Sequence, residues 1–148
     1  MKTNSGETKW VLIVNHGDKA TNGGSGTRYF VGDFDGKTFK EIQKSVWMDN
    51  GTDFYAAVTF SNIPNDKKIL LGWMSNWQYA TKVPTDVWRS AMTIPRELNL
   101  FKDKNGYFLK QSTITQFSTL LKRSVLVLMV CSVRPATGSR VRYRNWGW

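Results

Sequence analysis

The sequence predicts an all-β protein built from antiparallel sheets. Its apolar segments are short and rich in β-branched residues, and Asp-Gly or Asn-Gly dipeptides, which favour the tight turns of β-hairpins, separate them. These turn signals recur at intervals of roughly ten to twenty residues, and no apolar stripe of helical period precedes Thr113. At this level a sandwich, a barrel and a propeller all remain open.

The first predicted strand covers residues 9–15 (KWVLIVN), a continuous apolar run typical of a strand buried on both faces. The polar residues 16–26 that follow predict a loop. Its glycine-rich part, NGGSG at residues 22–26, lacks the Gly-Lys-Ser/Thr of a phosphate-binding loop and does not complete a dinucleotide fingerprint. We therefore interpret NGGSG as a flexible connection between strands.

Turn residues divide the rest of this region into further strands. Asp-Gly at residues 35–36 is a strong hairpin signal, and Asn-Gly recurs at residues 50–51 and 105–106. Pro-Asn-Asp at residues 64–66 marks another turn. The strands predicted between these turns lie at residues 29–34, 37–41, 54–60, 68–74, 99–102 and 107–110.

The composition changes after residue 110. All 11 acidic residues precede Lys104, whereas 8 of the 21 basic residues follow Asp103, so most of the formal charge of +10 belongs to the C-terminal part. Residues 134–148 are basic, free of acidic residues and without strand alternation. We expect a β domain at residues 1–110 and a divergent basic tail at residues 111–148, either frameshifted or disordered.

Charge and cysteine usage exclude several function classes. Because the excess positive charge lies in the tail, the main domain is not expected to bind nucleic acid. The first ten residues, MKTNSGETKW, lack the apolar core of a signal peptide, and this alone leaves the cellular compartment open. The apolar residues 125–131 are too few to span a bilayer, so no membrane partner is expected. The single cysteine, Cys131, excludes an intramolecular disulfide and a cysteine-based zinc site.

No residue pattern predicts a hydrolytic triad, a metal or a cofactor. His16 is the only histidine, and no G-x-S-x-G motif accompanies it. Asp33 and Asp35 superficially resemble a calcium loop, but Lys44 stands where the bidentate glutamate should be. We interpret both aspartates as turn residues.

The most unusual feature is the aromatic share of 14%, with 7 tryptophans. A sugar ring packs its C–H face on an indole and offers its hydroxyls to carboxylate, amide and guanidinium groups. Both kinds of residue are interleaved between residues 47 and 89, which indicates a carbohydrate site, although tryptophans that only pack strands fit the composition equally well. The residues are Trp47, Tyr55, Trp73, Trp77, Tyr79 and Trp88, with Asp49, Asp53, Asn76, Gln78 and Arg89.

Three long segments in a fixed order resemble one known family. DNGTDFYAAVTFSN (49–62), ILLGWMSNWQYATKVPT (69–85) and WRSAMTIPREL (88–98) closely resemble glycoside hydrolase family 32, which includes invertases, levanases and exo-inulinases. With RYFVGDFDGKTF upstream, the resemblance covers residues 10–110. It implies a five-bladed β-propeller with the active site in its central funnel, and retaining hydrolysis that releases fructose from sucrose, levan or inulin.

The resemblance also implies which residues bind substrate. Trp73, in GWMSNW, corresponds to an indole wall of the fructose pocket. Arg89 and Arg96 match family positions as well, and bracing of blade edges is an alternative role for both. The other substrate-binding candidates are the funnel-lining residues Asp53 and Tyr55 and the rim residues Asn76 and Trp77.

The sequence departs from the family in its catalytic motifs. The Asn-Asp-Pro-Asn nucleophile segment, the Arg-Asp-Pro segment and the Glu-Cys acid segment are all missing from the 148 residues. Five blades would need roughly 200 to 250 residues. We therefore expect a truncated fructoside hydrolase that starts just after the acid motif, carries part of the fructose pocket, has no catalytic residue and is inactive alone. The alternatives are a non-catalytic carbohydrate-binding β-protein and nucleic-acid binding through the Arg-rich end.

Overall fold

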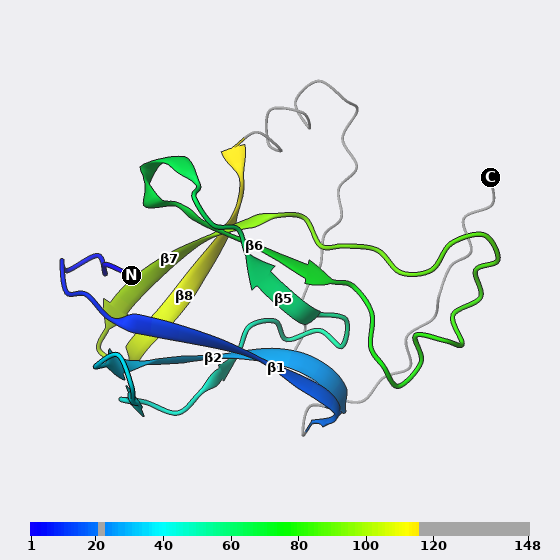
Figure 1. Cartoon of the computed structure of the whole chain (residues 1–148), viewed down its shortest axis with the longest axis horizontal. Coiled ribbons are helices and arrows are strands. Elements are labelled where there is room, and N and C mark those ends of the chain that lie inside the picture. The colour runs from blue at the N-terminus through cyan, green and yellow to red at the C-terminus, as the bar shows by residue number, and fades with distance from the viewer. Residues whose placement is uncertain (21–22, 116–148) are drawn as a thin grey trace.

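The computed structural model describes residues 1–20 and 23–115, which form two four-stranded antiparallel sheets (Figure 1). In the first sheet β1 pairs with one edge of β2, and β3 and β4 pair in turn with the other edge. The strands of this sheet are β1 (Trp10–Ala20), β2 (Gly24–Phe34), β3 (Phe39–Glu41) and β4 (Val46–Trp47).

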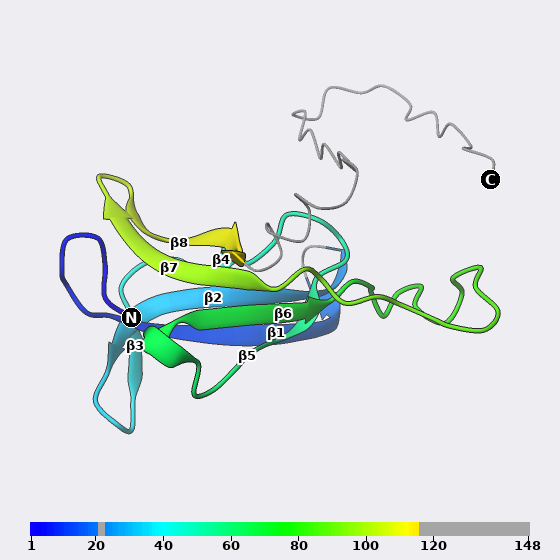
Figure 2. The same cartoon turned by 90° about the horizontal axis from the view of Figure 1, so that it is seen from above.

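The second sheet has the order β5-β6-β7-β8, so each strand pairs with the next one along the chain. A short 3-10 helix, Pro64–Asp66, lies between the first two of these strands. The connection of residues 74–95, between β6 and β7, projects away from both sheets (Figures 1 and 2). The strands are β5 (Tyr55–Thr59), β6 (Lys68–Trp73), β7 (Arg96–Asp103) and β8 (Gly106–Thr113).

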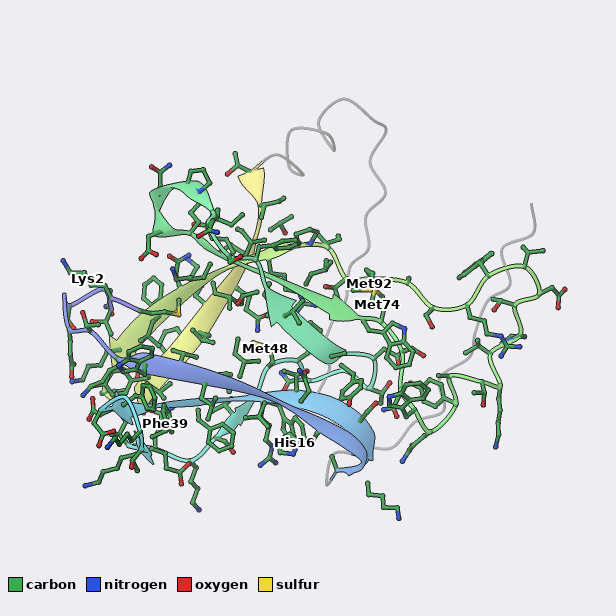
Figure 3. The ribbon with its side chains drawn as sticks, viewed as in Figure 1. Lys2, His16, Phe39, Met48, Met74 and Met92 are labelled. Carbon is green, nitrogen blue, oxygen red and sulfur yellow. The ribbon has the colours of Figure 1, made fainter. Side chains whose placement is uncertain are left out.

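The hydrophobic core lies between the two sheets. Figure 3 shows Met48 between them, and only 2% of its surface is exposed. Gly72 allows the Phe54 ring to lie against β6, because a Cβ at residue 72 would be 2.8 Å from Phe54 Cε2. The buried cluster among the described residues consists of Tyr29, Val31, Met48, Phe54, Ala57, Leu70, Leu98, Leu100 and Leu109.

The predicted Asp-Gly hairpin is confirmed, with a slightly longer turn. Asp35 Oδ1 accepts hydrogen bonds from the backbone N–H groups of Lys37 (2.8 Å) and Thr38 (2.7 Å). Gly36 has a φ of +96°, a conformation that glycine adopts without strain. Because residues 37 and 38 belong to this turn, β3 begins at Phe39, two residues later than predicted.

The predicted loop at residues 16–26 is wrong for most of that segment. β1 continues to Ala20 and β2 begins at Gly24, and these two residues still pair after an irregularity beyond His16. A polar sequence can extend a hairpin because the ladder joins backbone groups and does not require apolar side chains. Ser25 and Gly26, which we interpreted as part of a flexible connection, are buried residues of β2.

The last hairpin is also longer than its sequence pattern predicts. β7 and β8 pair from Asp103 with Gly106 to Arg96 with Thr113, so β8 ends three residues beyond the expected domain boundary. Residues 116–148, which make up most of the predicted basic tail, lie outside the described residues. The all-β prediction is confirmed for the part of the chain that the structure describes. No helix in that part is long and apolar enough to cross a membrane.

Candidate functional site

Three aromatic rings meet where β5 begins and β6 ends. Tyr55 pairs with Trp73 across the two strands, so both side chains project from the same face of the sheet. Their ring centroids are 6.2 Å apart, and the Trp77 ring lies 5.2 Å from that of Trp73 at an interplanar angle of 55°. Trp77 is 54% exposed, so the cluster is open to solvent. We call Tyr55, Trp73 and Trp77 the aromatic wall.

A β-bulge in β5 turns the Tyr55 side chain toward Trp73. Between Tyr55 and Val58, β5 has one residue more than the facing part of β6, and Ala56 in the bulge has a φ of +49°. In a regular strand Tyr55 and Ala57 would share one face. The extra residue breaks this alternation, so Tyr55 contacts Trp73 while Ala57 is buried in the core.

Asn76 supports the wall from within the protein, because its side chain is 1% exposed. Asn76 Oδ1 accepts hydrogen bonds from the backbone N–H groups of Ser25 (3.2 Å) and Gln78 (3.1 Å). Its Nδ2 donates to the carbonyl groups of Ser25 (3.3 Å) and Thr52 (3.0 Å). Two donors and two lone pairs are the full capacity of an amide, so Asn76 has none left for a ligand.

Asp53 lies in the loop between β4 and β5, where Tyr79 holds it. The Tyr79 hydroxyl donates a hydrogen bond to Asp53 Oδ1 and lies 3.1 Å from Thr52 Oγ1. Burial, and after it the hydrogen bond to Asp53, raises the pKa of Tyr79, so the phenol stays protonated as a donor. The exposed Asp53 carboxylate, two residues before Tyr55, is thereby held in one orientation.

A groove of about 540 Å³ runs beside this carboxylate, and its lining includes Asp49, Asp53 and Arg96. Arg96 Nη1 donates to Asp49 Oδ2 (2.7 Å) and to Gln111 Oε1 (3.0 Å). The guanidinium carbon also lies 4.8 Å from the ring centroid of Phe54. Arg96 thus connects β7, β8 and the loop before β5, which is the bracing arrangement expected as its alternative role.

The comparison with protein families decides the identity of this architecture. The model of the glycosyl hydrolases family 32 N-terminal domain matches residues 1–112, about three quarters of the chain. The chain belongs to glycoside hydrolase family 32. The resemblance read from the three sequence segments is therefore confirmed.

Curated relatives agree with this assignment. The chain is 49% identical over 122 residues to the levanase of Bacillus subtilis (strain 168), a match covering 79% of this chain and 18% of the levanase. It is 42% identical over 120 residues to the invertase of Kluyveromyces lactis, covering 76% of this chain and 20% of the invertase. The chain thus spans about a fifth of the length of these relatives.

Solved structures place the two sheets in a larger fold. A fructofuranosidase from Schwanniomyces occidentalis complexed with fructose matches with a TM-score of 0.67 and 37% identity, over 76% of this chain and 23% of that one. The exo-inulinase of Aspergillus awamori matches with a TM-score of 0.66 and 40% identity, over 77% and 24%. The two sheets form part of the five-bladed β-propeller of family 32, as the resemblance implied.

Not all the aromatic residues of the family 32 chain belong to the wall. Trp47, on β4, lies against His16 at 5.7 Å between ring centroids and beneath the Arg28 guanidinium at 4.0 Å. Figure 3 shows His16 on the β1 side of the molecule. Trp88 is 62% exposed on the projecting connection, where Arg89 donates to a backbone carbonyl of the same connection.

Two residues that hold this site in place, Tyr79 and Ser25, were not among the five substrate-binding candidates predicted from the sequence. Tyr79 was visible as an aromatic residue two positions after Trp77, but its bond to Asp53 depends on a loop 26 residues away. Ser25 gave no signal, because it lies in a glycine-rich segment that predicts a loop. Among residues 1–20 and 23–115, no group of three or more His, Cys, Asp or Glu side chains is arranged to hold a metal ion.

Proposed function

We propose that the aromatic wall and Asp53 form one side of a fructose-binding pocket in a fructoside hydrolase. The observation that carries this proposal is the solvent-open cluster of Tyr55, Trp73 and Trp77, with the Asp53 carboxylate, which Tyr79 holds, two residues before Tyr55. An indole packs against the C–H face of a sugar, and an ionised carboxylate accepts strong hydrogen bonds from its hydroxyls. Relatives named levanase, invertase and exo-inulinase support fructosides as the substrate class.

The five substrate-binding candidates have three different roles in this proposal. Trp73 lies between the other two rings and supplies the central stacking surface, with Tyr55 and Trp77 on either side of it. Asp53 binds hydroxyl groups at the rim. Asn76, whose amide is buried and fully hydrogen-bonded, positions the connection that carries Trp77 and makes no contact with the sugar.

We further propose that this chain binds fructosides without hydrolysing them. A retaining glycosidase needs two carboxyl groups about 5 Å apart, one as nucleophile and one as acid. The three carboxylate motifs of the family do not occur in the sequence. The two groove carboxylates have other partners, since Asp49 pairs with Arg96 and Asp53 accepts the Tyr79 hydroxyl. For the chain by itself, these observations favour the alternative of a non-catalytic carbohydrate-binding protein.

The test combines calorimetric titration and an activity assay on a monodisperse sample of the full chain. We expect binding of a fructose oligosaccharide, no release of fructose from sucrose or inulin, and a loss of affinity of about tenfold or more in Trp73→Ala. Trp88→Ala is the matched control, because it removes an exposed indole outside the wall. Absence of binding would refute the pocket, and fructose release that disappears in Asp53→Ala would refute the proposed lack of catalysis.

A further inference from the structure

Ser25 is fully buried in β2, yet all three of its polar groups bind the connection that carries Trp77. Its N–H donates to Asn76 Oδ1 (3.2 Å), and its carbonyl accepts from Asn76 Nδ2 (3.3 Å). Its hydroxyl accepts a hydrogen bond from the backbone N–H of Trp77 (3.1 Å). A residue of the first sheet therefore fixes the backbone of Trp77 from 52 positions away.

The neighbouring glycine makes this approach feasible. Gly24 has a φ of +135°, and a Cβ at this position would lie 2.3 Å from Asn76 Oδ1 and 2.5 Å from Asn76 Nδ2. Any larger residue would push the Asn76 amide away from the strand. The close approach of Asn76 therefore requires glycine at position 24, which explains this glycine better than the flexible connection we expected from the sequence.

Trp77 needs such an anchor because of where it lies. It belongs to the projecting connection of residues 74–95, and its indole is 54% exposed. Loops of this length have many conformations, and fixing an exposed indole in one of them costs conformational entropy. The hydrogen bonds to Ser25 preorganise the backbone, so the Trp77 indole already lies 5.2 Å from that of Trp73 in the absence of a ligand.

We propose that Ser25 is a positioning residue that holds the Trp77 indole beside Trp73 and thereby creates a second stacking surface for a fructose oligosaccharide. Trp73 receives one fructose unit, and the more exposed Trp77 contacts the next unit of the chain. The ligand part of this inference rests on the proposed function, whereas the positioning of Trp77 by Ser25 does not. It predicts that Ser25 contributes more to oligosaccharide binding than to binding of free fructose.

The experiment uses the full chain and measures two quantities separately: the arrangement of the Trp73 and Trp77 indoles, and the affinity for sugar. Two indoles at this separation couple and give a couplet in the far-ultraviolet circular dichroism spectrum, and Trp77→Phe identifies that signal. Ser25→Ala removes the hydroxyl bond to Trp77 while the backbone bonds to Asn76 remain. Thr27→Ala is the matched control, because Thr27 is equally buried on β2 and its hydroxyl binds Asn15 instead (2.7 Å).

We expect Ser25→Ala to lose most of the couplet and to bind a fructose oligosaccharide several-fold more weakly, with a smaller change for fructose, while Thr27→Ala keeps the couplet. Ser25→Cys nearly keeps the side-chain volume, but its sulfur accepts hydrogen bonds only weakly. We expect its couplet and its oligosaccharide affinity to lie between those of the wild type and Ser25→Ala, and it takes the place of Ser25→Ala if Ser25→Ala does not fold. An unchanged couplet in the Ser25 variants, or an equal loss in Thr27→Ala, would overturn the positioning role. Loss of the couplet with unchanged oligosaccharide affinity would support the positioning role and refute the sugar pocket.

Discussion

Asn15 on β1 binds both backbone groups of Ala57 on β5, so one side chain joins the two sheets. Asn15 Oδ1 accepts a hydrogen bond from the Ala57 N–H (2.9 Å), and Asn15 Nδ2 donates to the Ala57 carbonyl (3.2 Å). This pair of bonds lies directly after the bulge at Ala56, where the ladder between β5 and β6 is interrupted. The amide therefore takes the place of a strand partner.

Asn15→Ala should destabilise the fold because it leaves the buried Ala57 without partners for its N–H and carbonyl. We expect the free energy of unfolding to fall by about 1–3 kcal/mol, measured by urea denaturation. Asn99→Ala, at an exposed position on β7, is the control and should change stability by less than about 0.5 kcal/mol. Equal effects of the two variants would contradict the role of Asn15 as a link between sheets.

Gly72→Ala should also destabilise the protein, through steric overlap with the core. The added Cβ would lie 2.8 Å from Phe54 Cε2, and overpacking of this kind costs about 1–3 kcal/mol. Gly17→Ala is the matched control, because no atom lies within 4 Å of a Cβ built at that residue of β1. Thermal unfolding followed by circular dichroism separates the two. A Gly72→Ala variant as stable as Gly17→Ala would show that the Phe54 ring moves aside freely.

Tyr79→Phe tests whether the orientation of Asp53 matters for sugar binding. The substitution removes the hydroxyl that donates to Asp53 while the ring remains, so we expect fructoside affinity to fall by about two- to tenfold with little loss of stability. Tyr107→Phe is the control, since its hydroxyl binds Glu7 on the N-terminal segment instead (2.9 Å). Titration calorimetry on both variants gives the comparison, and an equal loss of affinity would argue against a specific role for Tyr79.

The Glu7 carboxylate predicts a dependence of stability on pH. Lys102 Nζ and the Tyr107 hydroxyl each lie 2.9 Å from Glu7 oxygens, and Lys9 Nζ lies 3.3 Å away. These donors, with Lys102 first, lower the pKa of Glu7 from 4.5 to about 2. Because the pKa in the folded state lies below that of the unfolded chain, this stabilisation is complete above pH 4.5 and is lost as the pH falls toward 2.

The corresponding experiment records the melting temperature between pH 6 and about pH 2. We expect a decrease that is steepest below pH 4.5 in the wild type and shallower in Glu7→Gln, which has no carboxylate to protonate. Glu41→Gln, at an exposed position on β3, is the control and should follow the wild-type curve. Parallel curves for wild type and Glu7→Gln would show that this cluster does not stabilise the folded state.

Local chemistry accounts for the parts of the fold that the sequence predicted. Asp35 forms its turn with residues two and three positions away, so a few adjacent residues were enough to predict the hairpin. The strands around the core alternate or run continuously apolar, as their burial requires. The sequence also identified the family, and it placed Tyr55, Trp73 and Trp77 among the candidates for one site.

Only the tertiary structure decided how these candidates are held. Ser25 meets Asn76 across 51 residues and Asn15 meets Ala57 across 42, and no local pattern encodes contacts between two sheets. The same limit explains the wrong loop at residues 16–26, where backbone pairing extends a hairpin without apolar side chains. Asn76 shows the difference most clearly. Its residue type suits a sugar hydroxyl, but backbone groups of β2, of the loop before β5 and of its own connection take all four of its hydrogen bonds inside the protein.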